Sequence, residues 1–540
     1  MPPHRNAYRP VVMGTRGVVT SAHPLASMAG IRALLAGGNA VDAAVAVGAA
    51  LNVVEPFMSG AGGIGLMLVS RDGGRERHVL DFIGHAPAAA DRTRVTEDEI
   101  AGGPKACATP GNLGGWLAAH ERFGRLPRAT VLEPAISMAE QGVPLTWKNV
   151  EFFENAGQTL ARSAEAGRLY LGDGGPRPGK VVTYRDLART LRQVAEGGAD
   201  AFYRGPIAKA IAAAVREAGG WLEEEDLARF APVWREPATI TYRGHEIASM
   251  PPPFAAFQML ETLNVLEGYD LRGWGHNTVD ALHHLIEAIK LASADRLAYA
   301  YTPDVPIRGL LSKAYAASQR ARIRSDRASV SEGERFNRDT LAGQIREGHP
   351  ARFENEQTTH FACADAEGTV VSVTQTLGVP FGSGFAVPGT GIVLNNILKW
   401  MDLDPESPNV LKPGRKAGTM MSPTQVYRDG GFLLSIGTPG SYGILQTTAQ
   451  MLLNVLEFGL NLQEAIEAPR ARVYRDRVVD AESRISPDVL DGLRRRGHQV
   501  NVIADWSWIV GGGQGIMRDS ESGALMGGAD PRRDGYALAV

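Results

Sequence analysis

The segment from Asn39 to about Val53 constrains the fold of this chain most, because apolar residues occupy nearly every face of the helix that it predicts. Asn39 has a side chain suited to capping the start of that helix. A glycine pair just before it ends another predicted helix, the alanine-rich stretch 25–36. A helix that is apolar all round is buried, so we expect the chain to enclose this one.

The chain changes character at Thr358. Before it, apolar residues recur at helical spacing over 130–141, 184–196, 206–218 and 279–300. After it, TTHFACADAEGTVVSVTQTL predicts a strand, a turn at 365–368 and a second strand, which together form a hairpin. Further strands are predicted at 18–21, 66–70, 78–82, 431–437 and 498–503, with a helix at 445–456. Hairpin-joined strands with helices stacked outside favour an α+β fold of antiparallel sheets covered by helices.

Composition excludes several classes of protein. The 540 residues are 44% hydrophobic and 21% charged, and the net charge of −3 gives no reason to expect nucleic acid or an anionic membrane as partner. The two cysteines, Cys107 and Cys363, make no disulfide framework, and no Cys/His cluster has metal-ligand spacing. No signal peptide is visible, and the most apolar stretch, 43–54, is too short to span a bilayer. We therefore expect a soluble cytoplasmic protein.

Thr358 is a candidate nucleophile at the start of the hairpin. A hydroxyl is a poor nucleophile at neutral pH and needs a base beside it. If the chain cuts itself before such a residue, the new α-amine titrates at about pH 8 and can accept the hydroxyl proton. A polar NEQ at 355–357 precedes Thr358. Ordinary β propensity also produces Thr-Thr at a strand start, so the bare pattern leaves both interpretations open.

A resemblance favours the nucleophile. The stretch 356–384, EQTTHFACADAEGTVVSVTQTLGVPFGSG, resembles the start of the small subunit of the gamma-glutamyltransferase family. Other stretches similar to that family follow its order over nearly the whole chain: TSAHPLASMAGIRALLAGGNAVDAAVA (20–46), ATPGNLGGW (108–116), PPPFAAFQ (251–258), HLIEAIKLASADR (284–296), MSPT (421–424), GTPGS (437–441), APR (468–470) and ADPRRDG (529–535). Several long motifs in one order are highly specific.

The resemblance implies the four-layer αββα sandwich of the N-terminal nucleophile hydrolases. A precursor of this kind cuts itself, here into a large subunit 1–357 and a small subunit 358–540, which stay together as one integrated fold. Thr358 is then both the processing residue and the nucleophile. Thr376 matches the family's second threonine, whose hydroxyl positions the first; without the resemblance it is an ordinary strand residue.

The oxyanion formed in such a reaction needs preorganised donors. GTPGS resembles the family's oxyanion turn, with the backbone N–H groups of Gly440 and Ser441 as donors. The family has two glycines there, and Ser441 replaces the second; without the resemblance the segment is only a strand-to-helix turn. Thr359 and His360 are expected to support the geometry, since the amine already serves as base.

The glycine-rich stretch SGAGGIG at 59–65 has two interpretations. It lies between a helix and a strand, as anion-binding loops do, but it has neither the GxGxxG nor the Lys-Ser/Thr register. We favour close backbone packing beside the active site.

The sequence departs from the family where a gamma-glutamyl group is held. There, an arginine after the LDF strand clamps the carboxylate, and an asparagine, a glutamine, an aspartate and a serine pair complete the clamp. This chain has other side chains at or beside these positions: Ile83, Gly378, Asn396, Lys399, Trp400, Thr419 and Met420. Isoleucine cannot replace bidentate recognition of a carboxylate, so either another basic residue has moved in or the acyl group is not glutamyl.

Three side chains carry two interpretations each. Lys399 and Arg470 are either anion partners or structural charges, and Trp400 is either a pocket wall or a core aromatic.

We predict acyl transfer from an amide to Thr358, which gives an ester that water releases. The expected partner is a small-molecule amide other than glutathione that carries a carboxylate; no metal or cofactor is needed, and a homodimer of two-subunit units is one allowed assembly. Relatives in the family include acylases acting on cephalosporin side chains and an amidohydrolase acting on oxamate. One rival is a gamma-glutamyltransferase or glutathione hydrolase with a rebuilt clamp. The other is a catalytically silent relative used for binding or assembly.

Overall fold

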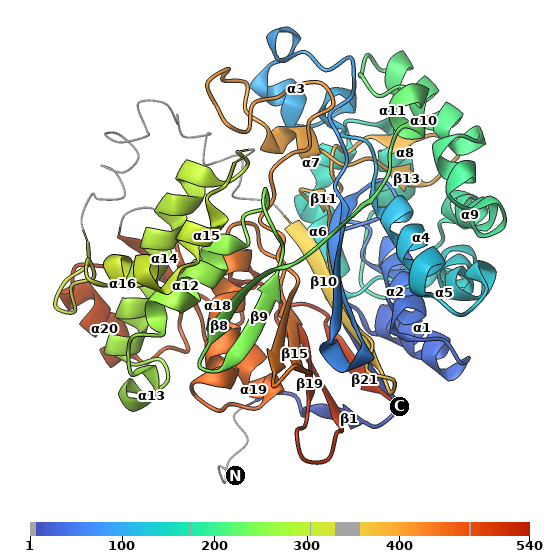
Figure 1. The fold of residues 1–540 in the computed structure, drawn as a ribbon. Helices are drawn as coiled ribbons and strands as arrows, with labels where there is room; N and C mark the ends of the chain where they lie inside the picture. Colours follow the sequence, from blue (N-terminus) through green and yellow to red (C-terminus); the bar gives the residue numbers. More distant parts are fainter. Residues whose placement is uncertain (1–6, 173, 303, 330–356, 475–476) are drawn as a thin grey trace.

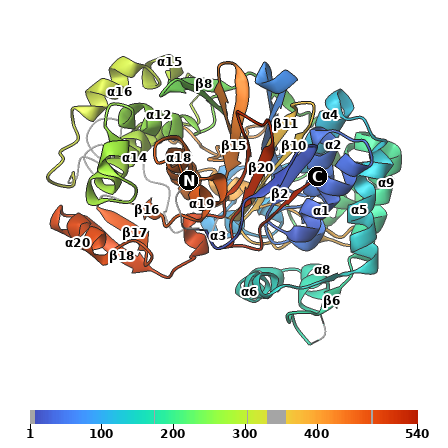
Figure 2. The ribbon, with the colours of Figure 1, turned by 90° about the horizontal axis from the view of Figure 1, so that it is seen from below.

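Two antiparallel sheets lie face to face, and helices cover the outer face of each (Figures 1 and 2). The computed structural model describes residues 7–172, 174–302, 304–329, 357–474 and 477–540. The layers form the α+β, αββα sandwich that the resemblance implies, so the predicted fold class is confirmed. Among the described helices, none is both long and apolar enough to cross a membrane.

Each sheet has seven strands. The β10 sheet has the order β21 (Tyr536–Ala539), β2 (Gly17–Ser21), β10 (Gln357–Asp365), β11 (Val370–Gly378), β3 (Ile64–Arg71), β4 (Glu76–Phe82) and β7 (Val233–Arg235). The β15 sheet has the order β1 (Val12–Gly14), β20 (Leu525–Ala529), β19 (Gln514–Arg518), β15 (Gly431–Gly437), β14 (Thr424–Arg428), β9 (His245–Ser249) and β8 (Ala238–Tyr242).

Helices from different parts of the chain form the two outer layers. The layer on the β10 sheet contains α1 (Pro24–Leu35), α2 (Ala40–Val54), α4 (Asn112–Phe123), α5 (Arg128–Gln141), α9 (Arg185–Tyr203) and α10 (Pro206–Glu217). The layer on the β15 sheet contains α12 (Phe257–Leu266), α14 (Val279–Tyr299), α16 (Lys313–Arg320), α18 (Gly443–Leu456) and α19 (Leu462–Glu467). Beside it lie the strands β16 (Ala471–Val473), β17 (Val478–Glu482) and β18 (Gln499–Ile503) with α20 (Pro487–Arg495).

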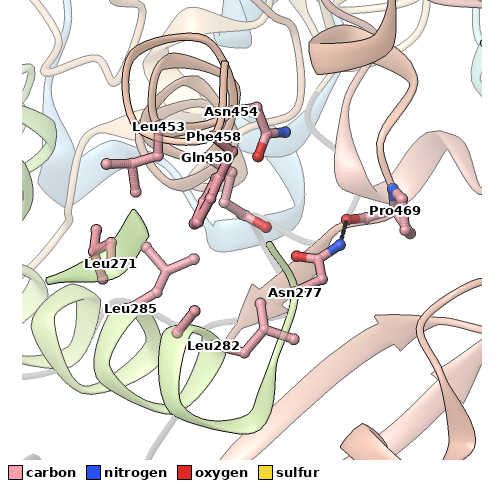
Figure 3. Close-up of a pocket in the computed structure, with 10 residues that line it drawn as sticks. Leu271, Asn277, Leu282, Leu285, Gln450, Leu453, Asn454, Phe458 and Pro469 are labelled. Carbon is pink, nitrogen blue, oxygen red and sulfur yellow. Dashed lines mark hydrogen bonds between the residues drawn. The ribbon is translucent and has the colours of Figure 1, made fainter. Parts of the chain in front are cut away.

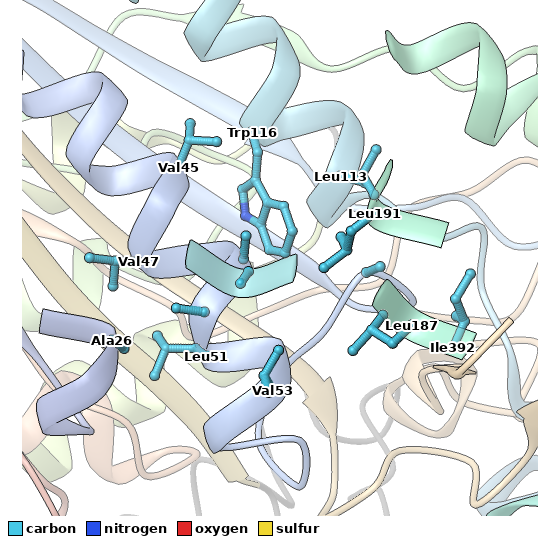
Figure 4. Close-up of a cluster of buried hydrophobic side chains, with 14 of the residues drawn as sticks. Ala26, Val45, Val47, Leu51, Val53, Leu113, Trp116, Leu187, Leu191 and Ile392 are labelled. Carbon is cyan, nitrogen blue, oxygen red and sulfur yellow. The ribbon is translucent and has the colours of Figure 1, made fainter. Parts of the chain in front are cut away.

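The predicted all-apolar helix is α2, and every one of its residues is buried. Asn39 caps it by accepting from the N–H groups of Val41 and Asp42, while Asp42 accepts from the Asn39 N–H in return. Trp116 of α4 packs against Gly48 of α2, where a Cβ would lie 3.0 Å from the indole (Figure 4). The indole N–H donates to the Gln375 side chain on β11 at 2.8 Å, which ties this helix layer to the sheet beneath it.

Each sheet is built from strands on both sides of residue 357. In the β10 sheet, β2 lies between β21 and β10, and β3 pairs with β11. In the β15 sheet, β1 pairs with β20 and β9 pairs with β14. The segments 1–357 and 358–540 are therefore interleaved and share one pair of sheets.

Most of the predicted elements are confirmed, including the hairpin β10–β11 and the helices near 130, 184, 206, 279 and 445. The strand predicted at 498–503 belongs to the small three-stranded sheet, where it runs parallel to β17. The strands β8, β9, β14 and β19 to β21 were not predicted from the sequence. Of the polar stretch 355–357 before Thr358, only Gln357 lies within the described residues.

Candidate active site

Thr358 lies at an irregularity in the pairing of β10 with β11. Gln357 pairs with Gly378 and Thr359 pairs with Gln375, so two steps along β10 match three steps along β11. This extra residue is a β-bulge, a feature that re-aims side chains. Thr358 therefore lies opposite Thr376 and Leu377, and both threonines are buried. The Thr376 hydroxyl accepts a hydrogen bond from the Gly378 N–H at 2.8 Å.

A buried arginine holds the backbone of Thr358. Arg533 Nη1 donates to the carbonyl oxygen of Thr358 at 3.1 Å and contacts Met58 Sδ at 3.5 Å. Burial lowers the pKa of Arg533, and the charge of Glu55 at the end of α2 opposes that shift. Burial raises the pKa of the Glu55 carboxyl to about 7, against the charge of Arg533 and the hydroxyl of Thr359.

Arg533 and Glu55 were not predicted as site residues from the sequence. The only signal was the motif ADPRRDG, which contains Arg533. No local pattern pointed to Glu55.

His360, on β10 two residues after Thr358, contacts both its own sheet and the facing sheet. Its Nδ1 lies 2.8 Å from the Thr374 hydroxyl, and burial lowers the pKa of the ring to about 3. A ring with so low a pKa is a poor base, which fits the expected supporting role. A Cβ on Gly437, at the end of β15, would lie only 2.3 Å from His360 Cε1. The end of β15 is thus pressed against the residue two positions after Thr358.

The turn that follows β15 contains Gly440 and Ser441, the two residues predicted to supply oxyanion donors. Gly440 has φ 130° and Ser441 has φ 56°, so both residues adopt positive φ angles that glycine tolerates best. Ser441 thus keeps the turn conformation although it replaces a glycine of the family. Helix α18 begins at Gly443, and its N-terminus adds positive potential beside these N–H groups. The contact of Gly437 with His360 places this turn beside the start of β10.

A second loop and a buried ion cluster support the turn. The Thr438 hydroxyl accepts from the Gly512 N–H at 2.9 Å. Asp530 accepts from the Gly513 N–H at 3.0 Å and pairs with Arg470 at 2.8 Å. Arg470 is fully buried and also donates to the Val510 carbonyl, so it is a structural charge. The interpretation of Arg470 as a substrate anion partner is therefore wrong.

The glycine-rich stretch 59–65 packs against the site. A Cβ on Gly63 would lie 2.4 Å from the Thr376 carbonyl oxygen, and one on Gly62 would lie 2.0 Å from the Val393 carbonyl oxygen. Asn395 Nδ2 donates to the Gly62 carbonyl at 2.7 Å. Close backbone packing, the interpretation that we favoured, is confirmed.

At Gly378 and Asn396, two positions where the family holds the gamma-glutamyl group, no side-chain polar group is left to bind a substrate. A Cβ on Gly378 would lie 2.0 Å from Asn396 Oδ1, so this site admits no side chain. Asn396 Oδ1 accepts from the Val379 N–H at 3.1 Å, and its Nδ2 donates to the Ala101 carbonyl at 2.9 Å. Both ends of the Asn396 amide are thus occupied by backbone.

The serine-pair positions are likewise engaged within the protein. Thr419 Oγ1 accepts from the Met421 N–H at 3.2 Å, and Met420 Sδ accepts from the Tyr301 hydroxyl at 3.0 Å.

Ile83 lies in the same row across the sheet as Thr358. Thr376 pairs with Ile64, and Gly65 pairs with Phe82, so Ile83 lies beside Ile64. The row from Thr358 to Ile83 crosses three strand spacings, about 14 Å. Ile64, Ile83 and Trp400 belong to one hydrophobic cluster between the sheets. Trp400 is buried, and its indole N–H has no acceptor within the described part of the chain. Lys399, in the same 3-10 turn (Ile397–Trp400), is also buried.

Two cations lie near the apolar row. Asp81, two residues before Ile83, accepts from Lys416 at 2.9 Å and from Arg235 at 3.1 Å. One carboxylate thus faces two positive charges, and a net positive charge remains beside Ile83. Burial lowers the pKa of Lys416, while Asp81 favours its charged form.

A separate small cleft lies in the outer helix layer between α14 and α18 (Figure 3). Its wall is formed by Leu271, Asn277, Ala281, Leu282, Leu285, Gln450, Leu453, Asn454, Phe458 and Pro469. Asn277 Nδ2 donates to the Pro469 carbonyl at 3.0 Å across its edge. None of the candidate catalytic residues lines this cleft.

Comparisons with known proteins cover the whole chain. Residues 26–540 match the family described as gamma-glutamyltranspeptidase. The acylase ACY 1 proenzyme of Pseudomonas sp. (strain SE83) is 38% identical over 98% of this chain and 94% of its own length. The glutathione hydrolase proenzyme of Escherichia coli (strain K12) is 34% identical over 96% of this chain and 91% of its own. The crystal structure of cephalosporin acylase from Bacillus halodurans superposes with a TM-score of 0.89, at 34% identity, covering 100% of this chain and 98% of the other.

Proposed function

Because the chain belongs to the gamma-glutamyltranspeptidase family and is thus an enzyme of the N-terminal nucleophile hydrolase type, we propose that Thr358 is its nucleophile. In this proposal the chain cuts itself between Gln357 and Thr358. The enzyme then transfers an acyl group from a small amide to Thr358 and releases it to water. The observation that carries the proposal is the meeting of Thr358, Thr376 and the 437–441 turn at one end of the two facing sheets.

The first step is self-cleavage. The Thr358 hydroxyl attacks the carbonyl carbon of Gln357, and the peptide nitrogen leaves as the α-amine of Thr358. Water then hydrolyses the resulting ester, which leaves Gln357 as a new C-terminus and Thr358 as a new N-terminus. The interleaved strands keep 1–357 and 358–540 together, because neither piece holds a complete sheet.

The second step is hydrolysis of the substrate. The free amine of Thr358 takes the proton of its own hydroxyl, and the oxygen attacks the amide carbonyl. The N–H groups of Gly440 and Ser441 stabilise the oxyanion, supported by the N-terminus of α18. The amine of the substrate leaves with a proton, and water releases the acyl group from the ester. Arg533 keeps the Thr358 backbone in place throughout, through its carbonyl oxygen.

For the substrate we propose a small amide whose acyl group carries a carboxylate but not the α-amino group of glutamate. Beyond the two threonines, the row from Thr358 to Ile83 is apolar, and the side chain of Asn396 is occupied by backbone groups. The positive charge of Lys416 and Arg235 beside Ile83 suits a distant carboxylate. Similarity to acylases, one of them a cephalosporin acylase, supports this preference.

Similarity to glutathione hydrolases favours a second candidate function, that of a gamma-glutamyl hydrolase or transferase with a rebuilt clamp. Three amides of one chromogenic aniline separate the two candidates: glutaryl, gamma-glutamyl and uncharged butyryl. Preference for the glutaryl anilide, with loss of that preference in Lys416→Met, supports the proposal. A preference for gamma-glutamyl anilide and glutathione supports the second candidate. If no anilide reacts although the chain cuts itself, the silent relative is favoured.

A further inference from the structure

Three buried side chains with metal-ligating atoms meet outside the candidate active site. His283 and Glu287 lie one turn apart on α14, and His498 comes directly before β18. One nitrogen or carboxylate oxygen of each lies within 4.8 Å of the others. His283 and His498 are 215 positions apart, which explains why the sequence showed no metal-ligand spacing.

The hydrogen bonds of His283 show which of its two ring nitrogens presents a lone pair to the cluster. Its Nε2 lies 2.7 Å from the Arg324 carbonyl oxygen, which can only accept, so Nε2 carries the proton. Its Nδ1 therefore presents a lone pair, 2.8 Å from His498 Nε2. A histidine whose outer N–H donates to a carbonyl is the usual arrangement of a metal ligand.

His498 brings a second buried ring to the cluster. Its Nδ1 is buried and has no partner in the part of the chain that the structure describes. The Nε2–H group of His498 therefore donates a hydrogen bond to His283 Nδ1.

The charged groups around the cluster compete with a metal ion for Glu287 but leave lone pairs available to bind one. Glu287 pairs with Lys290 at 2.8 Å through one oxygen and accepts from the Ser329 N–H at 3.1 Å through the other. A carboxylate has further lone pairs for a metal. Arg496, the other nearby cation, pairs with Asp280. Among the described residues, Lys290 is thus the positive charge that pairs with Glu287 and competes with a metal for it.

We propose that His283 Nδ1, His498 Nε2 and Glu287 form a binding site for Zn²⁺ or a similar late first-row dication. Two imidazoles and a carboxylate suit these ions, whereas Ca²⁺ and Mg²⁺ prefer oxygen ligands. When the metal binds, His498 loses the proton on Nε2 and carries one on Nδ1 instead, so the ring stays neutral. The metal joins α14 to the strand β18. If the chain cuts itself as proposed above, the metal also links the two products, although the site does not depend on that cut.

Metal titration of the whole protein tests the site without reference to activity. The protein is stripped with EDTA, dialysed and titrated with ZnCl₂ by calorimetry, with thermal unfolding followed in parallel. His498→Gln and His283→Gln remove ligands. His284→Gln is the matched control, because His284 is a buried neighbour on α14 that bonds the Asp280 carbonyl and Ser325 instead. Lys290→Gln removes the competing charge.

We expect one Zn²⁺ per chain in the wild type and in His284→Gln, with a higher Tm when zinc is bound. The two ligand variants should bind at least about tenfold more weakly. Lys290→Gln should bind more tightly than the wild type. The proposal is overturned if the wild type takes up no stoichiometric zinc, or if His498→Gln binds zinc as well as His284→Gln does. Either result leaves the proposed amidase activity unaffected.

Discussion

Arg533 donates a hydrogen bond to the carbonyl oxygen of Thr358 at 3.1 Å, from a position 175 residues further along the chain. The guanidinium is buried, and the charge of Glu55 opposes the lowering of its pKa that burial causes. This contact fixes the peptide unit between Thr358 and Thr359, and with it the backbone that carries the Thr358 side chain.

Replacing Arg533 tests this positioning role. In Arg533→Gln we expect kcat to fall about ten- to hundredfold, the loss of one hydrogen bond from a charged group, while KM changes little. Arg533→Lys should recover part of the rate. Arg495→Gln, at an exposed site on α20, is the control and should keep wild-type kinetics. An equal rise in KM with unchanged kcat in Arg533→Gln would place Arg533 in substrate binding instead.

Glu55 predicts a specific dependence of stability on pH. Its folded pKa, about 7, lies above the ordinary value of 4.5, so folding favours the protonated form. The contribution to stability is fully present below about pH 4.5 and is lost as the pH rises towards 7. Relative to Glu55→Gln, the wild type should lose about 3 kcal/mol of unfolding free energy across that window. Urea unfolding of both proteins at several pH values measures the difference, and a difference independent of pH would contradict the assignment.

Ser441 adopts a left-handed conformation that costs a residue with a side chain about 1 kcal/mol. Ser441→Gly should therefore raise the unfolding free energy by up to about 1 kcal/mol while leaving the backbone N–H in place. We expect kcat to stay within about twofold of the wild type, since the proposed oxyanion donor is a main-chain group. Ser441→Val, whose branched side chain disfavours this conformation, should lose activity. If Ser441→Gly were inactive, the hydroxyl rather than the N–H would be the functional group.

The contact between Gly437 and His360 should be sensitive to a single methyl group. A Cβ at residue 437 would lie 2.3 Å from His360 Cε1, so we expect Gly437→Ala to push the 437–441 turn, with its proposed oxyanion donors, away from β10. Activity should fall by at least about tenfold, because small displacements of catalytic groups are costly. The double variant Gly437→Ala/His360→Ala, which makes room for the methyl group, should regain part of that loss. Equal losses in the single and double variants would show that the two residues are not coupled.

Local patterns in the sequence were enough to predict the hairpin, the buried helix α2 and the capping role of Asn39. These features depend on residues close together in the chain, where apolar periodicity and capping act. The same patterns gave no sign of β8, β9, β14 or β19 to β21. Each of these strands has only four or five residues and is held in place by pairing with distant strands.

The site was predictable where a motif carries it and not where distant segments meet. Thr358, Thr376 and the turn at 437–441 each lie within a motif. The Arg533–Thr358 contact joins segments that no spacing rule connects. Gly378 was interpreted only as the loss of an asparagine, whereas the structure gives a steric reason: Asn396 occupies the space of any side chain there.

The most direct test of the account is the intact mass of the purified chain beside its Thr358→Ala variant. In proportion to length, 357 and 183 of the 540 residues share the 57.7 kDa mass, which predicts products of about 38 and 20 kDa. We predict that the wild type yields these two products, with Thr358 as the new N-terminus, and that Thr358→Ala stays whole. A wild-type chain that remains whole after prolonged incubation, or a variant that is cut at the same bond, would contradict Thr358 as the self-processing nucleophile.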